Sequence, residues 1–134
     1  MCALSFACAA KEIKKFARVV AFDFRGHGMS KKPEGDDDTS METLVGDTIE
    51  FLNFLVKEYP KSTFLLMGHS LGGAVACKAS KKIEEIPTLN ERVVGLIVID
   101  VSEGTAMEAL PHMRTLIQNK PQRFNSVQEA IRYM

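Results

Sequence analysis

Continuous apolar runs alternate along this chain with stretches whose apolar residues recur every three or four positions. The runs at residues 19–22, 63–67 and 93–99 are short and bounded by polar or glycine-containing segments, which is typical of buried strands. Residues 41–56 have helical spacing, begin after the capping residues Thr39 and Ser40, and reach Tyr59-Pro60. Residues 3–16 and 71–82 are likewise predicted to be helical.

The expected order is helix, strand, helix, strand, helix, strand, which predicts an α/β fold with a parallel sheet and helices on both faces. After Asp100 the pattern changes to helices only. One is expected over residues 103–119, broken at Pro111. Another is expected from Ser126, with Glu129 three residues on as a capping box.

Three parallel strands form a small sheet, and both of its edges would expose unpaired backbone groups. The expected elements also begin and end inside helices. From these two features we expect residues 1–134 to be an incomplete α/β domain.

Composition narrows the class of protein. The 134 residues are 46% hydrophobic and 25% charged with zero formal net charge, which is typical of a globular protein. A balanced charge offers no field for nucleic acid or anionic lipid, and no segment approaches the ~18 apolar residues of a membrane span. We therefore expect no nucleic-acid and no membrane partner. The sequence contains no metal-ligand cluster and no phosphate-binding loop, so no cofactor is implied.

Three cysteines, Cys2, Cys8 and Cys77, are too few and too irregular for a disulfide framework. Reduced thiols fit a cytoplasmic or nuclear location. The apolar N-terminus precedes its lysines, which is the wrong order for a signal peptide.

The chemistry centres on Gly68-His69-Ser70-Leu71-Gly72, which fits the G-x-S-x-G nucleophile elbow between a strand and a helix. The small residues let strand and helix approach, and the sharp turn exposes the serine hydroxyl at a helix N-terminus. Ser70 is therefore the predicted nucleophile, and the backbone N–H of Leu71 is a predicted oxyanion donor. His69 is expected to pack or orient rather than to act as the base.

A serine nucleophile needs a base that an acid orients, and in this fold the chain order is serine, acid, histidine. Asp100 ends the strand at residues 93–99 and is the best acid candidate, with Glu103 as the alternative. Only His112 follows the acid, and it lies in a helical stretch; His27 belongs to a glycine-rich turn. We therefore expect the base to lie beyond residue 134.

The elbow, the segment AFDFRGHGMS and the strand that ends in aspartate together resemble the α/β-hydrolase superfamily. GHSLGGAVA, GLIVIDVSEGTAMEAL and NKPQRFNSVQEAI more specifically resemble the protein phosphatase methylesterase family. That resemblance runs from about residue 3 to residue 134. Its most specific part is the segment at residues 100–107, which generic esterases lack.

The resemblance implies that Ser70 is the nucleophile, Asp100 the acid and the Leu71 amide one oxyanion donor. It divides the chain into a core portion, residues 1–103, and the start of a helical lid, residues 104–134, where Met107 is expected to contact substrate. The family removes the methyl ester from the C-terminal leucine of the protein phosphatase 2A catalytic subunit, which becomes the expected partner.

Two alternatives stay open. One is a generic carboxylesterase, and the other is a non-catalytic short form that binds the phosphatase. In the family, the second oxyanion donor precedes this segment and the histidine follows it. The resemblance therefore implies a fragment with little esterase activity of its own.

Overall fold

The computed structural model describes residues 2–101, 111–113, 115, 118–119, 121 and 123–133. The chain divides into two compact units, Met1–Val101 and Ser102–Met134. The first unit contains the sheet and the elbow. The predicted division into a core portion and a lid at residues 103 and 104 stays a prediction.

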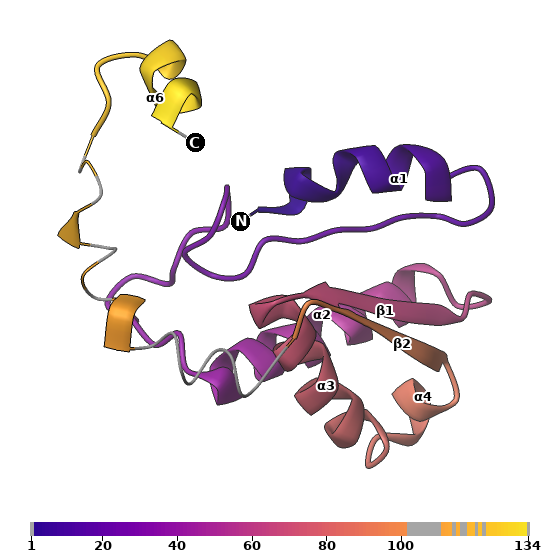
Figure 1. Ribbon diagram of the computed structural model, residues 1–134. Coiled ribbons are helices and arrows are strands. Elements are labelled where there is room, and N and C mark those ends of the chain that lie inside the picture. The colour runs from indigo at the N-terminus through magenta and orange to yellow at the C-terminus, as the bar shows by residue number, and fades with distance from the viewer. Residues whose placement is uncertain are drawn as a thin grey trace. The chain divides into compact units, whose positions relative to one another are not determined.

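In the first unit, helices precede the first strand and also separate it from the second (Figure 1). In chain order its elements are the 3-10 helix η1 (Ala3–Phe6), α1 (Ala7–Ile13), α2 (Met41–Glu58), β1 (Phe64–His69), α3 (Leu71–Ile83), α4 (Pro87–Asn90) and β2 (Val93–Ile99). The second unit contains α6 (Val127–Tyr133), and residues 111–113 are also helical.

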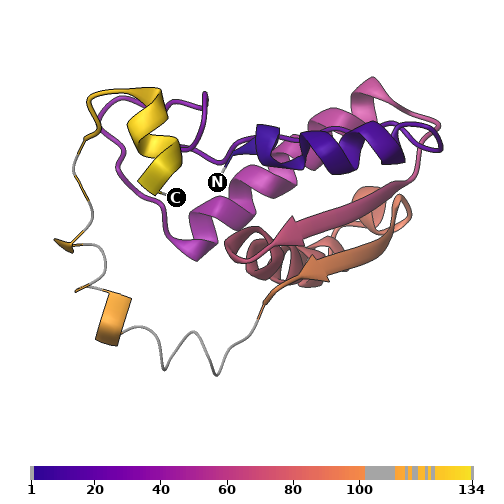
Figure 2. The same cartoon turned by 45° about the horizontal axis from the view of Figure 1, so that its top comes forward.

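β1 and β2 form a two-stranded parallel sheet, and Figure 2 shows both arrows pointing the same way. The register pairs Phe64 with Val93, slips by one residue, and then continues to the pair of His69 and Ile99. The carboxyl ends of both strands therefore meet at one edge. This parallel pair, joined through α3 and α4, confirms the predicted α/β fold class.

The predicted strand at residues 19–22 is wrong. These residues have no regular secondary structure, and the described sheet has two strands instead of three. An isolated extended segment is not a strand, because ladder hydrogen bonds need a neighbour. The apolar side chains are used differently: the Phe22 ring lies 4.5 Å from that of Phe51 on α2 and 5.2 Å from that of Phe24.

The other elements predicted before Asp100 are confirmed with small shifts at the ends. α2, α3 and β2 occupy the predicted segments, β1 runs two residues further, and the predicted helix at 3–16 is η1 followed by α1. Ser40 caps α2, because its Oγ accepts from the backbone N–H of Thr43 at 3.3 Å. Most of the helix expected over residues 103–119 lies outside the described residues.

α6 begins with the predicted cap. The N–H of Glu129 donates to Ser126 Oγ at 3.1 Å. The Glu129 carboxylate reaches back and accepts from the N–H of Asn125 at 2.8 Å, one residue earlier than in an ideal capping box.

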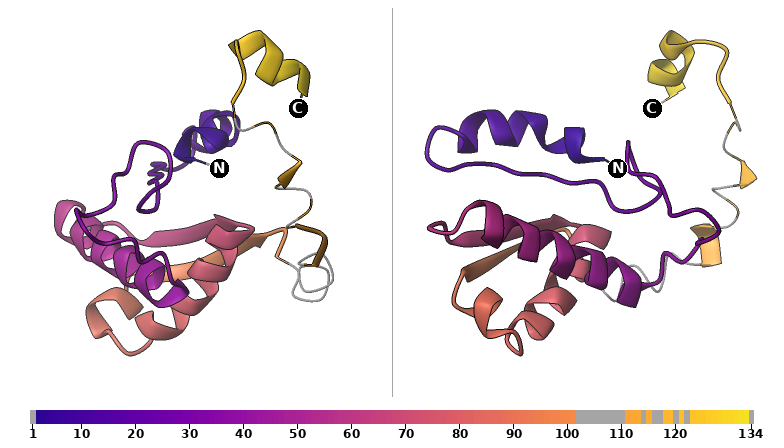
Figure 3. Two further views of the ribbon diagram at one scale, coloured as in Figure 1. Left: turned by 90° about the vertical axis from the view of Figure 1, so that its left-hand side faces the viewer. Right: turned by 180° about the vertical axis from the view of Figure 1, so that it is seen from behind.

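The core lies between α3, which packs on both strands, and α2 and α4, which lie on the same side of the sheet (Figure 3). Its buried members are Leu44, Val45, Leu52, Val75, Ala79, Ile83 and Leu89. Each fully buried aliphatic side chain contributes about 1.5–3 kcal/mol. This packing fixes α3 against the sheet, and with it the turn that precedes α3. None of the helices in the described part of the chain has both the length and the apolar character that crossing a bilayer requires.

Candidate active site

Ser70 occupies the turn between β1 and α3 with φ 51° and ψ −120°, outside the regions that L-residues favour. Its N–H donates to the carbonyl of Ile99 at 2.9 Å, and its own carbonyl accepts from Ala74 at 3.0 Å. The backbone of the residue is thus held from β2 on one side and from α3 on the other. The residue is exposed, as a nucleophile must be.

The glycines around Ser70 are not equivalent. A Cβ on Gly68 would lie 2.2 Å from the carbonyl oxygen of Gly72 and 2.6 Å from the backbone nitrogen of Gly73. A Cβ on Gly73 would lie 2.6 Å from Val101 Cγ2, whereas one on Gly72 would meet nothing closer than Phe24 Cε2 at 4.0 Å. Close approach of strand and helix therefore requires Gly68 and Gly73, and only the first belongs to the five-residue motif.

Leu71 is the first residue of α3. The first N–H groups of a helix have no acceptor in a preceding turn, and they lie at the positive end of the helix dipole. The Leu71 amide is thus available to a developing oxyanion beside Ser70. That role stays a prediction, since it depends on where the substrate binds.

Asp100 directly follows β2 and has φ 52°. Among the described residues, Ser70 and Asp100 are the two non-glycine residues with positive φ. The Asp100 side chain is 79% exposed, and its Oδ2 lies 3.7 Å from Nε2 of His69. The backbone N–H of Ser70 is hydrogen-bonded to the carbonyl of Ile99, the residue before Asp100. The predicted nucleophile and the predicted acid therefore lie at the same edge of the sheet.

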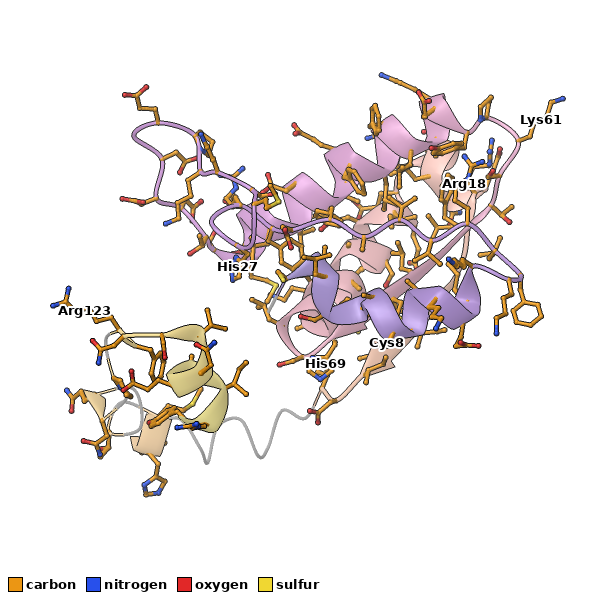
Figure 4. All side chains as sticks on the ribbon, turned by 90° about the horizontal axis from the view of Figure 1, so that it is seen from above. Cys8, Arg18, His27, Lys61, His69 and Arg123 are labelled. Carbon is orange, nitrogen blue, oxygen red and sulfur yellow. The ribbon has the colours of Figure 1, made fainter. Side chains whose placement is uncertain are left out.

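The described histidines lie in three different settings. His69, labelled in Figure 4, is the last residue of β1, and its Nδ1 is buried without a hydrogen-bond partner among the described residues. His27 lies in the turn after Phe24, with its Nδ1 3.1 Å from the carbonyl of Arg25, which agrees with a structural role. His112 is an exposed helical residue of the second unit. Glu103 and Met107 lie outside the described residues.

The turn around His27 is fixed by Asp23. Its carboxylate accepts from the N–H of Ala3 at 2.5 Å and from that of Met29 at 3.1 Å, and these bonds lower the pKa of Asp23. Gly28 has φ 51°, and a Cβ there would lie 2.1 Å from the Asp23 carboxylate. Hydrogen bonds to Asp23 therefore hold the glycine-rich segment in its turn. The Phe24 ring of the same segment lies next to the elbow, with its Cε2 4.0 Å from where a Cβ on Gly72 would be.

Arg25 ties the same loop to α2, which the sequence pattern did not indicate. Its guanidinium donates twice to Asp47, at 2.6 and 2.5 Å, and once to Asp36 at 2.8 Å. The Asp47 carboxylate, together with Asp36, raises the pKa of Arg25 far above its ordinary value. Asp47 and Asp36 lie 22 and 11 residues from Arg25 along the chain, so no regular spacing in the sequence predicts that these three side chains meet. In the described part of the chain, no three His, Cys, Asp or Glu side chains form a group that could hold a metal ion.

A serine held at positive φ between a parallel strand and a helix, with an aspartate at the end of the neighbouring strand, defines the α/β-hydrolase class. The sequence agrees with the geometry. A family model described as serine aminopeptidase, S33, matches residues 11–118, and the chain belongs to this α/β-hydrolase family.

The chain is also similar to curated proteins named protein phosphatase methylesterase 1. It is 34% identical over 135 residues to one from Cryptococcus neoformans, covering 96% of this chain and 31% of the relative. It is 40% identical over 113 residues to one from Schizosaccharomyces pombe, covering 84% and 31% respectively. It is 36% identical over 116 residues to the human protein, covering 87% and 28%. The chain thus spans less than a third of the length of these relatives.

Proposed function

We propose that this chain carries the nucleophile and the acid of a serine carboxylesterase that removes the methyl ester from the C-terminal leucine of the protein phosphatase 2A catalytic subunit. The observation that carries the proposal is the coincidence of backbone strain with the predicted chemistry. The two non-glycine residues with positive φ in the described chain are Ser70 and Asp100. Strained backbone persists where surrounding structure enforces it, and it concentrates at functional sites.

The substrate class is supported by the relatives. Proteins named protein phosphatase methylesterase 1 align with 84–97% of this chain. The three cysteines are free thiols, which supports a cytoplasmic or nuclear location where a phosphatase partner would be met.

The proposed reaction is acyl transfer in two steps. Ser70 Oγ attacks the ester carbonyl carbon while a base takes the hydroxyl proton, and the Leu71 N–H stabilises the resulting oxyanion. The C–O bond to the methoxy group then breaks, and methanol leaves with the proton from the base. Water attacks the acyl-enzyme in the same way, which releases the free carboxylate and restores the Ser70 hydroxyl. Asp100 orients the base and stabilises its positive charge.

No base is assigned within Met1–Val101. The His27 ring is hydrogen-bonded to the carbonyl of Arg25 in its own turn, and Nε2 of His69 lies 3.7 Å from the Asp100 carboxylate. The expected histidine therefore stays a prediction. Without an oriented base the serine hydroxyl is a weak nucleophile, so we expect slow turnover unless a base is added.

The test supplies that base from solution. The 134-residue chain is mixed with a peptide ending in leucine methyl ester, and methanol release is measured with and without imidazole. Ser70→Ala is the matched control, because imidazole alone also cleaves esters. We expect imidazole-dependent release that exceeds the control, and labelling of Ser70 by a fluorophosphonate that is likewise slow unless imidazole is added.

Two further substrates separate the reaction classes. Methyl acetate has the same leaving group as the leucine methyl ester, so Ser70-dependent hydrolysis of methyl acetate at an equal or higher rate would favour a generic carboxylesterase. Cleavage of leucine p-nitroanilide would instead favour aminopeptidase chemistry, as the description of the matching family suggests. Equal rates for the wild type and Ser70→Ala on all three substrates would refute a nucleophilic role for Ser70.

A further inference from the structure

His69 faces the predicted acid rather than the predicted nucleophile. It is the last residue of β1 and pairs in register with Ile99, the last residue of β2. Its ring therefore lies at the end of the sheet where Asp100 follows β2. Its Nε2 lies 3.7 Å from Asp100 Oδ2, and its side chain is 27% exposed. The other ring nitrogen, Nδ1, is buried. Among the described residues no hydrogen bond joins His69 to the Ser70 hydroxyl, and the nearest charged group to Nε2 is the Asp100 carboxylate.

The surroundings of the two ring nitrogens select one tautomer. A neutral imidazole carries its hydrogen on one nitrogen and a lone pair on the other. A hydrogen on Nδ1 would be a buried donor with no acceptor among the described residues, and it would leave the Nε2 lone pair facing a carboxylate oxygen. A hydrogen on Nε2 avoids both penalties, because it points at the Asp100 carboxylate. The buried Nδ1 is then a lone-pair acceptor without a donor, which costs less than a buried N–H without an acceptor beside an unfavourable contact at Nε2.

The carboxylate lacks other support. Within the described residues, no hydrogen bond to the Asp100 side chain is present, and 79% of that side chain is exposed. An aspartate that orients a catalytic base must itself be held in one rotamer, because misplacement by about 1 Å can cost on the order of 100-fold in rate. Among the described residues, the His69 ring is near enough to hold the Asp100 carboxylate, with Nε2 3.7 Å from Oδ2.

We infer that His69 is a positioning residue: its neutral ring, protonated at Nε2, holds Asp100 Oδ2 and leaves Oδ1 free for the catalytic base. The separation of 3.7 Å must close by about 0.8 Å to form a normal hydrogen bond. Such contraction is expected, since catalytic hydrogen bonds are often long without substrate and shorten in the reacting complex. This inference rests on the proposed function, which makes Asp100 the acid.

The experiment is a long-range ¹H–¹⁵N correlation spectrum of the ¹⁵N-labelled 134-residue chain, recorded at a pH where its imidazoles are neutral. His27 is a matched internal control of opposite form, because its Nδ1 faces the carbonyl of Arg25 and must donate to it. We expect His69 protonated at Nε2 and His27 protonated at Nδ1. Signals are assigned by their loss in His69→Gln and His27→Gln.

Two variants test whether Asp100 is the partner. Asp100→Gly removes the carboxylate while tolerating the φ of 52°. The buried Nδ1 still keeps the hydrogen on Nε2, but without the carboxylate facing it the Nε2 signal of His69 should move, while the His27 signals stay unchanged. Asp100→Asn keeps an acceptor oxygen and should preserve the Nε2-protonated form.

A His69 ring protonated at Nδ1 in the wild type would overturn the inference. Signals of His69 that do not change in Asp100→Gly would also overturn it. If either variant does not fold, the wild-type tautomer still decides. The spectrum needs no substrate, so a failed methanol-release assay with the expected tautomers would reject the proposed reaction and keep the His69–Asp100 pair.

Discussion

Replacing Gly68 by alanine is expected to destabilise the chain far more than replacing Gly72, although both are glycines of the same five-residue motif. At position 68 the new methyl group would lie 2.2 and 2.4 Å from the carbonyl oxygen and carbon of Gly72, and 2.6 Å from the nitrogen of Gly73. All three are backbone atoms at the start of α3, so no side-chain rotation can relieve the overlap.

The magnitude follows from what must move. Overpacking costs about 1–3 kcal/mol where neighbouring side chains can shift, and here the backbone of α3 has to move away from β1. We therefore expect a loss of ~3 kcal/mol or more for Gly68→Ala. Gly72→Ala meets nothing closer than 4.0 Å and replaces a helical glycine, which gains up to about 1 kcal/mol. The two variants should thus differ by ~3–4 kcal/mol.

The assay is urea denaturation followed by circular dichroism, with thermal melting as a second measurement. For a unit of about 100 residues, the size of Met1–Val101, 1 kcal/mol shifts Tm by ~4 °C or more, so Gly68→Ala should melt at least ~12 °C below the wild type. Failure of Gly68→Ala to fold points the same way. Equal stability of the two variants, or a larger loss for Gly72→Ala, would refute the close approach of strand and helix as the reason for Gly68.

Three further perturbations test other parts of the structure. Ser70→Gly should be more stable than Ser70→Ala by about 1 kcal/mol in urea denaturation, because only glycine adopts the turn without strain; the reverse order would contradict the strain. The Thr43 hydroxyl, followed by the N–H and the hydroxyl of Ser40, donates to the Asp38 carboxylate and lowers its pKa, so the stabilising effect of Asp38 is present at neutral pH and lost below about pH 4. Asp38→Asn should flatten that acid limb in melting curves, and an unchanged limb would show that other groups cause it. Leu89→Ala should lower the free energy of unfolding by about 2–5 kcal/mol, because the Leu89 side chain is fully buried. The control Leu65→Ala, at a side chain that is 57% exposed, should lower it by less than ~1 kcal/mol. Similar losses in the two variants would mean that α4 does not close the core.

Local patterns in the sequence determined most of the elements. The recurrence of apolar residues in α2, the cap at Ser40 and the continuous run of β2 act over a few neighbouring residues, so they can be recognised without the fold. The elbow at Ser70 is local in the same sense, because its strand, turn and helix are consecutive. The position of Asp100 could also be anticipated, since parallel strands place their carboxyl ends together.

Other features depended on which distant segments meet. The run at residues 19–22 is apolar enough for a strand, yet a strand exists only with a partner, and Phe22 packs on Phe51 instead. The pairing of Arg25 with Asp47 joins groups 22 residues apart, and neither residue signals the other. Residue spacing reports contacts along one element, whereas these contacts form between elements.

The elbow shows the division most clearly. The sequence by itself determined that a serine would lie between a strand and a helix, because the chain has the glycines and apolar residues for that turn. Only the tertiary structure decided that Gly68 and Gly73 are the tight positions, and that His69 faces Asp100. The physical reason is that these relations depend on distances of a few ångströms between β1, β2 and α3, and packing of the whole core sets those distances.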